Sequence, residues 1–251
     1  MRLKILLLSF LTVFLSASIV GATIIPFGDT SYFWPGWQNS SGDDSKDTIG
    51  VPNFTGGQAE LISGGLTKLT FYREPGSHLY GVLAPGDLFI DIGSNDSWDY
   101  VVDLTSWDAS EANNPAASVG NYPIYSISLA LGDSAGYILS GTDKSDGWSN
   151  YYIRDTHPVA WDNRGQGNDE LVWFSGWGDG STTSYIFDFV GTGLIGALDI
   201  GGSFTIGWTL NCANDVLYEE IPVPEPATML LLGVGLIGLA GVGRRKFFKK
   251  A

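Results

Sequence analysis

Acidic side chains are the most numerous groups in this sequence that could take part in chemistry. The 251 residues contain 27 Asp and Glu, 13 Lys and Arg and two His. Two carboxylates that flank a sugar bond suffice for glycoside hydrolysis, but no spacing singles out one pair among so many acids. His78 and His157 are accompanied neither by a G-x-S-x-G nucleophile motif nor by zinc-ligand spacing. We therefore predict a protein that is not an enzyme and has no cofactor. A glycan-active enzyme is the less favoured alternative.

Two loops bring oxygen ligands together with glycine, as calcium sites do. DIGSND contains Asp91 and Asp96, and DNRGQGNDE contains Asp162 and Asp169. Calcium prefers flexible loops rich in oxygen, although neither loop matches the EF-hand pattern. A solvated turn of Asp, Asn and Gly is the alternative, and it is more common. Ca²⁺ is thus the one ion for which the sequence offers candidate ligands.

Several tryptophans lie close to turn residues and could bind sugars. Their indole faces can stack on a sugar ring while nearby acids and amides bond its hydroxyls, so a lectin-like, carbohydrate-binding module is an alternative function. Packing in the core or in loops is the favoured interpretation, because tryptophan is mostly buried in proteins. The candidate sugar contacts are Trp148, Trp161 and Trp177, and the same weighing applies to Trp34 and Trp37.

The elements that would position these residues are short strands separated by turn residues. The clearest is SFTIGWTL, residues 203–210, in which every second residue is large and apolar, as one buried face requires. Tyr185, Phe187 and Phe189 likewise share one face, and Trp98, Tyr100 and Val102 are expected to do so. Further strands are predicted at residues 66–72, 88–92, 98–104, 124–131, 136–140, 171–174 and 184–190.

No segment between the two ends has a sustained helical period, and the chain contains 34 glycines. This pattern predicts an all-β fold, an antiparallel β-sandwich of jelly-roll type in a single domain. The single cysteine, Cys212, excludes an intramolecular disulfide. If the strand continues, Cys212 falls on the same apolar face as residues 204, 206, 208 and 210, so we expect a buried, inert thiol.

Both ends of the chain have the character of targeting segments. The N-terminus, MRLKILLLSFLTVFLSASIVGA, has a basic start, an apolar centre and small residues before Thr23, which is the layout of a signal peptide cleaved after Ala22. Near the C-terminus, residues 227–243 form an uncharged run of seventeen residues, close to the lower limit for a membrane-spanning helix. Arg244, Arg245 and Lys246 follow the run, and the positive-inside bias places them in the cytoplasm.

The order of a Pro224-Glu225-Pro226 triplet, an apolar run and a terminal basic cluster resembles the PEP-CTERM sorting signal. That resemblance implies export in a Gram-negative bacterium that makes exopolysaccharide, and processing by an exosortase, a membrane protease of transpeptidase-like type. Ahead of it, SFTIGWTLNCANDVL resembles the end of the domain in a group of exosortase-dependent surface proteins. The matching positions are Trp208, Thr209, Cys212, Asn214 and Asp215.

These segments divide the chain into five parts. They are a signal peptide (1–22), a secreted β-sandwich domain (23–218), a Pro-rich spacer with the triplet (219–226), a transmembrane helix (227–243) and a basic cytoplasmic tail (244–251). Seven of the 13 basic residues lie in the two ends, while all 27 acids lie between residues 23 and 225, which leaves a net charge of −21 after processing. So acidic a surface excludes nucleic acid as a partner.

We therefore expect a non-catalytic protein that is exported through the inner membrane. It is held there transiently by a single-pass anchor and is then cut by an exosortase. Its destination is the cell surface or the extracellular matrix, where we expect it to associate with extracellular polysaccharide or biofilm.

Overall fold

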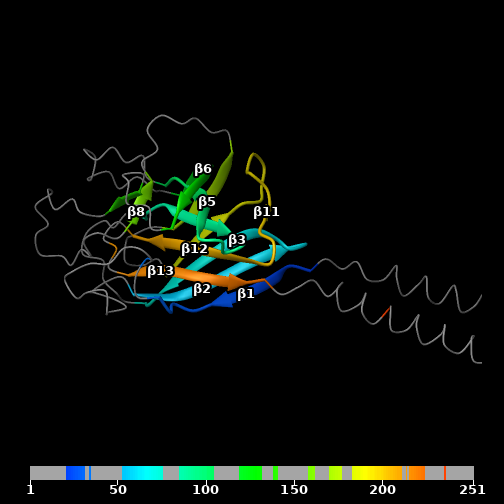
Figure 1. Ribbon diagram of the computed structural model, residues 1–251, viewed down its shortest axis with the longest axis horizontal. Coiled ribbons are helices and arrows are strands. Elements are labelled where there is room, and N and C mark those ends of the chain that lie inside the picture. Colours follow the sequence, from blue (N-terminus) through cyan, green and yellow to red (C-terminus); the bar gives the residue numbers. More distant parts are fainter. Residues whose placement is uncertain are drawn as a thin grey trace, which may run out of the picture.

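The structure is a computed structural model, and every strand that it defines belongs to an antiparallel pairing. It describes residues 21–31, 34, 53–75, 85–104, 119–131, 138–140, 158–161, 170–176, 183–210, 213, 215–223 and 235. The strands, drawn in Figure 1, are β1 (Thr23–Phe27), β2 (Phe54–Ile62), β3 (Gly65–Arg73), β4 (Leu88–Ile92), β5 (Ser97–Val102), β6 (Gly120–Ala130), β7 (Ile138–Ser140), β8 (Pro158–Trp161), β9 (Leu171–Ser175), β10 (Ser184–Asp188), β11 (Leu198–Asp199), β12 (Ser203–Thr209) and β13 (Val216–Pro222).

One sheet of eleven strands curls into an incomplete barrel. Its order is β1-β2-β3-β10-β9-β6-β5-β4-β12-β13, with β11 added beside β3, while β7 and β8 form a separate pair. The N-terminal part of β6 pairs with β9 and the remainder pairs with β5, so this long strand joins the two halves of the sheet. The outermost strands, β1 and β13, come into contact, which brings the two edges together (Figure 1). The predicted all-β, antiparallel fold is confirmed, but the strands form a near-barrel from one curled sheet in place of the predicted jelly-roll sandwich.

The hairpin between β2 and β3 shows how local sequence sets the register. Ile62 pairs with Gly65, so the loop consists of Ser63 and Gly64 alone. Both have positive φ, 55° and 84°, as a type I′ turn requires at its two central residues. Glycine adopts this geometry without strain, and the turn's twist matches that of the paired strands.

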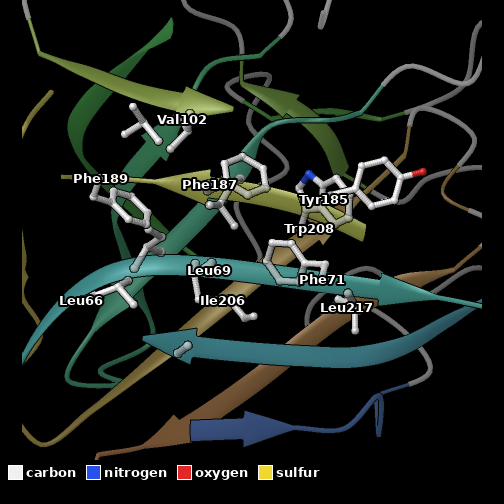
Figure 2. Close-up of a cluster of buried hydrophobic side chains, with 14 of the residues drawn as sticks. Leu66, Leu69, Phe71, Val102, Tyr185, Phe187, Phe189, Ile206, Trp208 and Leu217 are labelled. Atoms are coloured by element: carbon white, nitrogen blue, oxygen red, sulfur yellow. The ribbon is translucent and has the colours of Figure 1, made fainter. Parts of the chain in front are cut away.

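The main core lies between the two halves of the sheet, with Trp208 of β12 at its centre (Figure 2). The indole stacks on Phe71 of β3, with ring centroids 4.8 Å apart and an interplanar angle of 17°. It also contacts Tyr185 and Phe187 of β10, at 4.9 and 5.8 Å. Its Nε1–H donates to the Gly86 carbonyl at 3.0 Å, so the one polar atom of this buried ring is satisfied.

A second apolar cluster covers the outer face of β4, β5 and β12. Trp34 is its centre, with Phe89 and Trp98 at centroid distances of 5.4 and 5.2 Å. Strand β12 is therefore buried on both faces, whereas its alternation predicts one buried face only. Gly207 makes this possible, because a Cβ atom there would lie 2.4 Å from the Trp34 ring. The packing role favoured for Trp34 is confirmed.

Strand β5 does not have the single apolar face that the sequence predicts for it. A register shift lies between Trp98, opposite Leu129, and Tyr100, opposite Ser126. Three residue steps on β6 face two on β5 at this point, and the regular alternation of β5 is interrupted there. Trp98 accordingly packs in the outer cluster, while Tyr100 and Val102 belong to the main core. The expectation that these three share one face was wrong.

A buried carboxylate, Asp87, fastens strands that are far apart in the sequence. One of its oxygens accepts a hydrogen bond from the Leu104 N–H after β5, and the other accepts from the Trp161 N–H of β8, both at 2.8 Å. The residue is 1% exposed. A buried carboxylate is stable only when hydrogen bonds replace its lost water, and these two N–H groups do so.

All eight predicted strands correspond to observed ones, and β4 has the predicted bounds. Tyr185, Phe187 and Phe189 are buried in one core, as predicted. Of the two predicted terminal helices, only Gly21, Ala22 and Gly235 are described. Cys212, Asn214, Trp37 and both histidines lie outside the described residues.

Candidate functional site at the C-terminal strand

Strand β13 leads directly into the predicted sorting motif and is firmly held. It pairs with β12 over its whole length, from Thr209↔Val216 to Ser203↔Pro222. Beyond the strand, the Val223 N–H donates to the Gly202 carbonyl at 3.0 Å. The residue that follows this last hydrogen bond is Pro224, the first of the triplet.

The other edge of β13 is fastened to the segment that follows β1. Glu219 accepts hydrogen bonds from both the backbone N–H and the hydroxyl of Thr30, and its hydroxyl contact is 2.9 Å. Ile221 is fully buried in the main core. The domain boundary predicted at residue 218 therefore falls within β13, and residues 219–222 of the predicted spacer are strand. Their acidic and proline residues suggest a linker, but every second side chain packs inward.

The Trp208-Thr209 and Asp215 positions of the second resemblance serve to hold the turn between β12 and β13. The Thr209 hydroxyl lies 2.7 Å from the Asp215 carbonyl oxygen. The Asp215 carboxylate accepts a hydrogen bond from the Phe54 N–H at the start of β2. Together with the Trp208 contacts in the core, these bonds tie the last hairpin to the opposite half of the sheet. In the described part of the chain, these residues have a structural role.

The first candidate calcium loop folds as a capped turn. Asp91 is fully buried, and its two oxygens accept hydrogen bonds from the N–H groups of Asn95 and Asp96, both at 3.1 Å. Burial raises the pKa of the Asp91 carboxyl above its ordinary value, while the two backbone bonds act against this rise. Burial together with the charges of Asp96, Asp91 and Glu220 raises the pKa of Tyr218 to about 12.

This geometry matches the alternative stated for that loop, an Asp/Asn/Gly turn. Within the described ranges, no group of three or more His, Cys, Asp or Glu side chains is placed to hold a metal ion. Asp96 has a positive φ of 66° and lies in the same turn. Asp162 and Asp169 of the second loop are outside the described residues, so calcium binding there stays a prediction.

Trp161 lies in the outer cluster. It is 6% exposed, and its ring centroid is 5.1 Å from that of Tyr125. In this position its indole face packs against protein. Trp148 and Trp177 are outside the described residues, so sugar contacts by these two side chains stay a prediction.

A different tryptophan, Trp173 of β9, lines a shallow surface cavity. Its strand neighbours Val172 and Phe174 are fully buried, so Trp173 points to the outer face. The cavity has a volume of about 260 Å³. We call it the Trp173 hollow, and its lining residues are Asn121, Trp173, Asp188, Val190, Thr192 and Leu194. Side chains alternate along the predicted strand 171–174, so the sequence would have placed the Trp173 indole on the outer face, opposite to Val172 and Phe174.

Comparison with known proteins identifies the C-terminal segment. Residues 222–246 match the model of the PEP-CTERM protein-sorting motif, and the match includes Pro224, Glu225 and Pro226 together with Arg244, Arg245 and Lys246. No curated protein and no solved structure shows significant similarity to the chain.

The motif implies exosortase-dependent sorting of an exported protein directed to the cell surface. The predicted resemblance to PEP-CTERM proteins is thus confirmed. Among the described residues, no helix has the length and apolar character needed to cross a membrane.

Proposed function

We propose that the protein is a non-catalytic surface or matrix component, which residues 227–243 hold at the inner membrane until an exosortase cuts near Pro224-Glu225-Pro226. The observation that carries this proposal is the position of the sorting motif, whose match at residues 222–246 starts at the end of β13, where the Val223 N–H donates to the Gly202 carbonyl. The polypeptide then enters the extracellular polysaccharide or remains attached to the envelope.

Chain dimensions support a barrel held close to the bilayer. A helix of residues 227–243 is about 25 Å long at ~1.5 Å per residue, near the thickness of the hydrocarbon core. Three residues, 224–226, separate Val223 from residue 227, and an extended chain spans at most ~14 Å over the four residue steps between them. The barrel therefore rests at the headgroups while the anchor is intact.

The direction of the chain ends agrees with this placement. The start of β1 and the end of β13 lie at the same end of the barrel (Figure 1). A signal peptide that precedes Thr23 and an anchor that follows Val223 can then occupy one bilayer without distorting the barrel. Basic residues 244–246 remain on the cytoplasmic side.

The charge of the processed chain supports release rather than retention at the membrane. A net charge of −21 repels anionic headgroups, and the only basic cluster near the bilayer leaves with the tail. Cleavage thus removes both the apolar segment and the bases that favour the membrane.

Two observations support a non-catalytic role. The Trp173 hollow contains one carboxylate, Asp188, whereas glycoside hydrolysis requires two. The described buried acids Asp87, Asp91, Asp215 and Glu219 each accept hydrogen bonds from backbone N–H groups, which assigns them to the fold.

Replacement of the triplet by alanine tests the proposal. In cells that contain exosortase, we expect Pro224→Ala, Glu225→Ala, Pro226→Ala together to leave an uncut, membrane-bound chain, because the anchor is intact but the cleavage signal is lost. A chain that ends at Val223 is the matched control and is expected to be exported without membrane retention. Equal size, membrane retention and secretion in the wild type and both variants would contradict the proposal.

A further inference from the structure

The Trp173 hollow has the composition of a sugar-binding subsite. Trp173 lies opposite Asp188 of β10 on one side and opposite Asn121 of β6 on the other. One row on the outer face of the sheet thus presents an amide, an indole and a carboxylate side by side. Thr192 adds a hydroxyl, and Val190 and Leu194 add apolar walls.

These groups match the two kinds of surface that a pyranose ring offers. The C–H face of the ring is apolar and packs on a flat aromatic side chain, whereas the hydroxyls at its edge need donors and acceptors. The asparagine amide supplies both, a carboxylate accepts, and threonine does either. Small-molecule sites combine apolar walls with a few fixed polar groups in this way.

The Asp188 carboxylate beside Trp173 is held in place before any ligand binds. One Asp188 oxygen accepts a hydrogen bond from the Val190 N–H at 3.0 Å, and the other lies 3.7 Å from the Lys68 Nζ. Lys68 also pairs with Glu60 at 3.6 Å. Side chains that are fixed on a sheet lose little further entropy on binding, and this favours affinity.

Charge and size narrow the class of ligand. Asp188 and the net charge of −21 oppose anions, and a cationic ligand would compete with Lys68 for Asp188. A volume of about 260 Å³ is slightly below the usual range for small-molecule sites, so the hollow suits one ring rather than an extended chain. Val190, which is 47% exposed, leaves apolar surface for the ligand to cover.

We propose that the Trp173 hollow binds a neutral pyranose residue of a polysaccharide, with the ring stacked on Trp173 and its hydroxyls bonded by Asn121 and Asp188. This site differs from the loop tryptophans considered from the sequence. Its test uses purified protein, so its failure is distinguishable from a failure of sorting.

The test is binding of the full chain, in a detergent without a sugar headgroup, to an array of oligosaccharides. The array carries neutral hexamers of glucose, galactose, mannose and N-acetylglucosamine in α and β linkage, and matched uronic-acid hexamers. We expect at least one neutral hexamer to bind. Trp173→Ala should weaken that binding roughly tenfold or more, a loss of ~1.4 kcal/mol per factor of ten. Trp173→Phe, which keeps a ring face, should retain part of it.

Tyr72→Ala is the matched control, because Tyr72 is an exposed aromatic residue on the same face of the sheet, opposite Ser184 and outside the hollow. It should leave binding unchanged. Asn121→Ala alters an exposed side chain and provides a second variant if Trp173→Ala lowers the melting temperature. Failure of every neutral hexamer to bind would overturn the proposal. So would binding that Trp173→Ala and Asn121→Ala leave intact, or that Tyr72→Ala weakens equally.

Discussion

Replacement of Asp87 by alanine should destabilise the barrel more than replacement of any exposed acid. The carboxylate accepts hydrogen bonds from two buried backbone N–H groups, those of Leu104 and Trp161, at 2.8 Å each. A buried donor left without a partner costs about 1–3 kcal/mol, so Asp87→Ala should lower the free energy of unfolding by about 2–6 kcal/mol. This is a large share of the ~5–15 kcal/mol that typical domains have.

Urea unfolding of the purified chain, followed by tryptophan fluorescence, measures this loss. The midpoint should fall for Asp87→Ala while the slope m stays unchanged, as expected when stability alone changes. Asp87→Asn keeps one acceptor oxygen and should lose at least half as much. Asp199→Ala is the control, because Asp199 is exposed and its contact to the Gly201 N–H is 3.5 Å long. Its effect should stay within about 0.5 kcal/mol.

Equal midpoints for Asp87→Ala and Asp199→Ala would refute the reasoning. That result would mean that water, or a rearranged backbone, satisfies the Leu104 and Trp161 N–H groups without the carboxylate.

Two further predictions concern the outer cluster and the Asp91 turn. Gly207→Ala places a methyl group 2.4 Å from the Trp34 ring. It should lower the free energy of unfolding by about 1–3 kcal/mol through overpacking. In a double-mutant cycle, Trp34→Ala should relieve part of this loss, because it removes the ring that the methyl group meets. Full additivity would contradict that contact. Burial raises the pKa of the Asp91 carboxyl above its ordinary value of 3.8, so the folded state holds this proton more tightly, and the contribution of Asp91 to stability should fall as pH rises through its folded-state pKa. Asp91→Asn cannot ionise, so its stability relative to the wild type should increase with pH in urea titrations; a decrease would show that the two backbone hydrogen bonds outweigh burial.

The sequence predicts best those strands in which one face is buried and turns are local. Strand β10 is an example, because Tyr185 and Phe187 alternate with residues that are less buried. Strands β1, β8 and β11 were not predicted, nor were the longer strands β2 and β13. Strand β2 contains two adjacent glycines, Gly56 and Gly57, and strand β13 contains Glu219, Glu220 and a proline, and all of these lower the local strand signal. Their pairing partners supply the stability that local propensity lacks.

Contacts between distant residues account for what the sequence could not indicate. The register shift after Trp98 arises where β5 pairs with β6, and nothing in WDYVVD marks it. The two bonds of Asp87 join residues 17 and 74 positions away. The C-terminal motif, by contrast, depends on residue order alone, and it was recognised without the fold.

The C-terminus of the extracellular protein, determined by mass spectrometry in cells with and without exosortase, tests the central claim most directly. The account predicts a chain that begins at Thr23 and ends close to Pro224-Glu225-Pro226 when exosortase is present, and a membrane-bound chain that extends to Ala251 when it is absent. An extracellular chain that retains residues 227–251, or the same C-terminus in both strains, would contradict it.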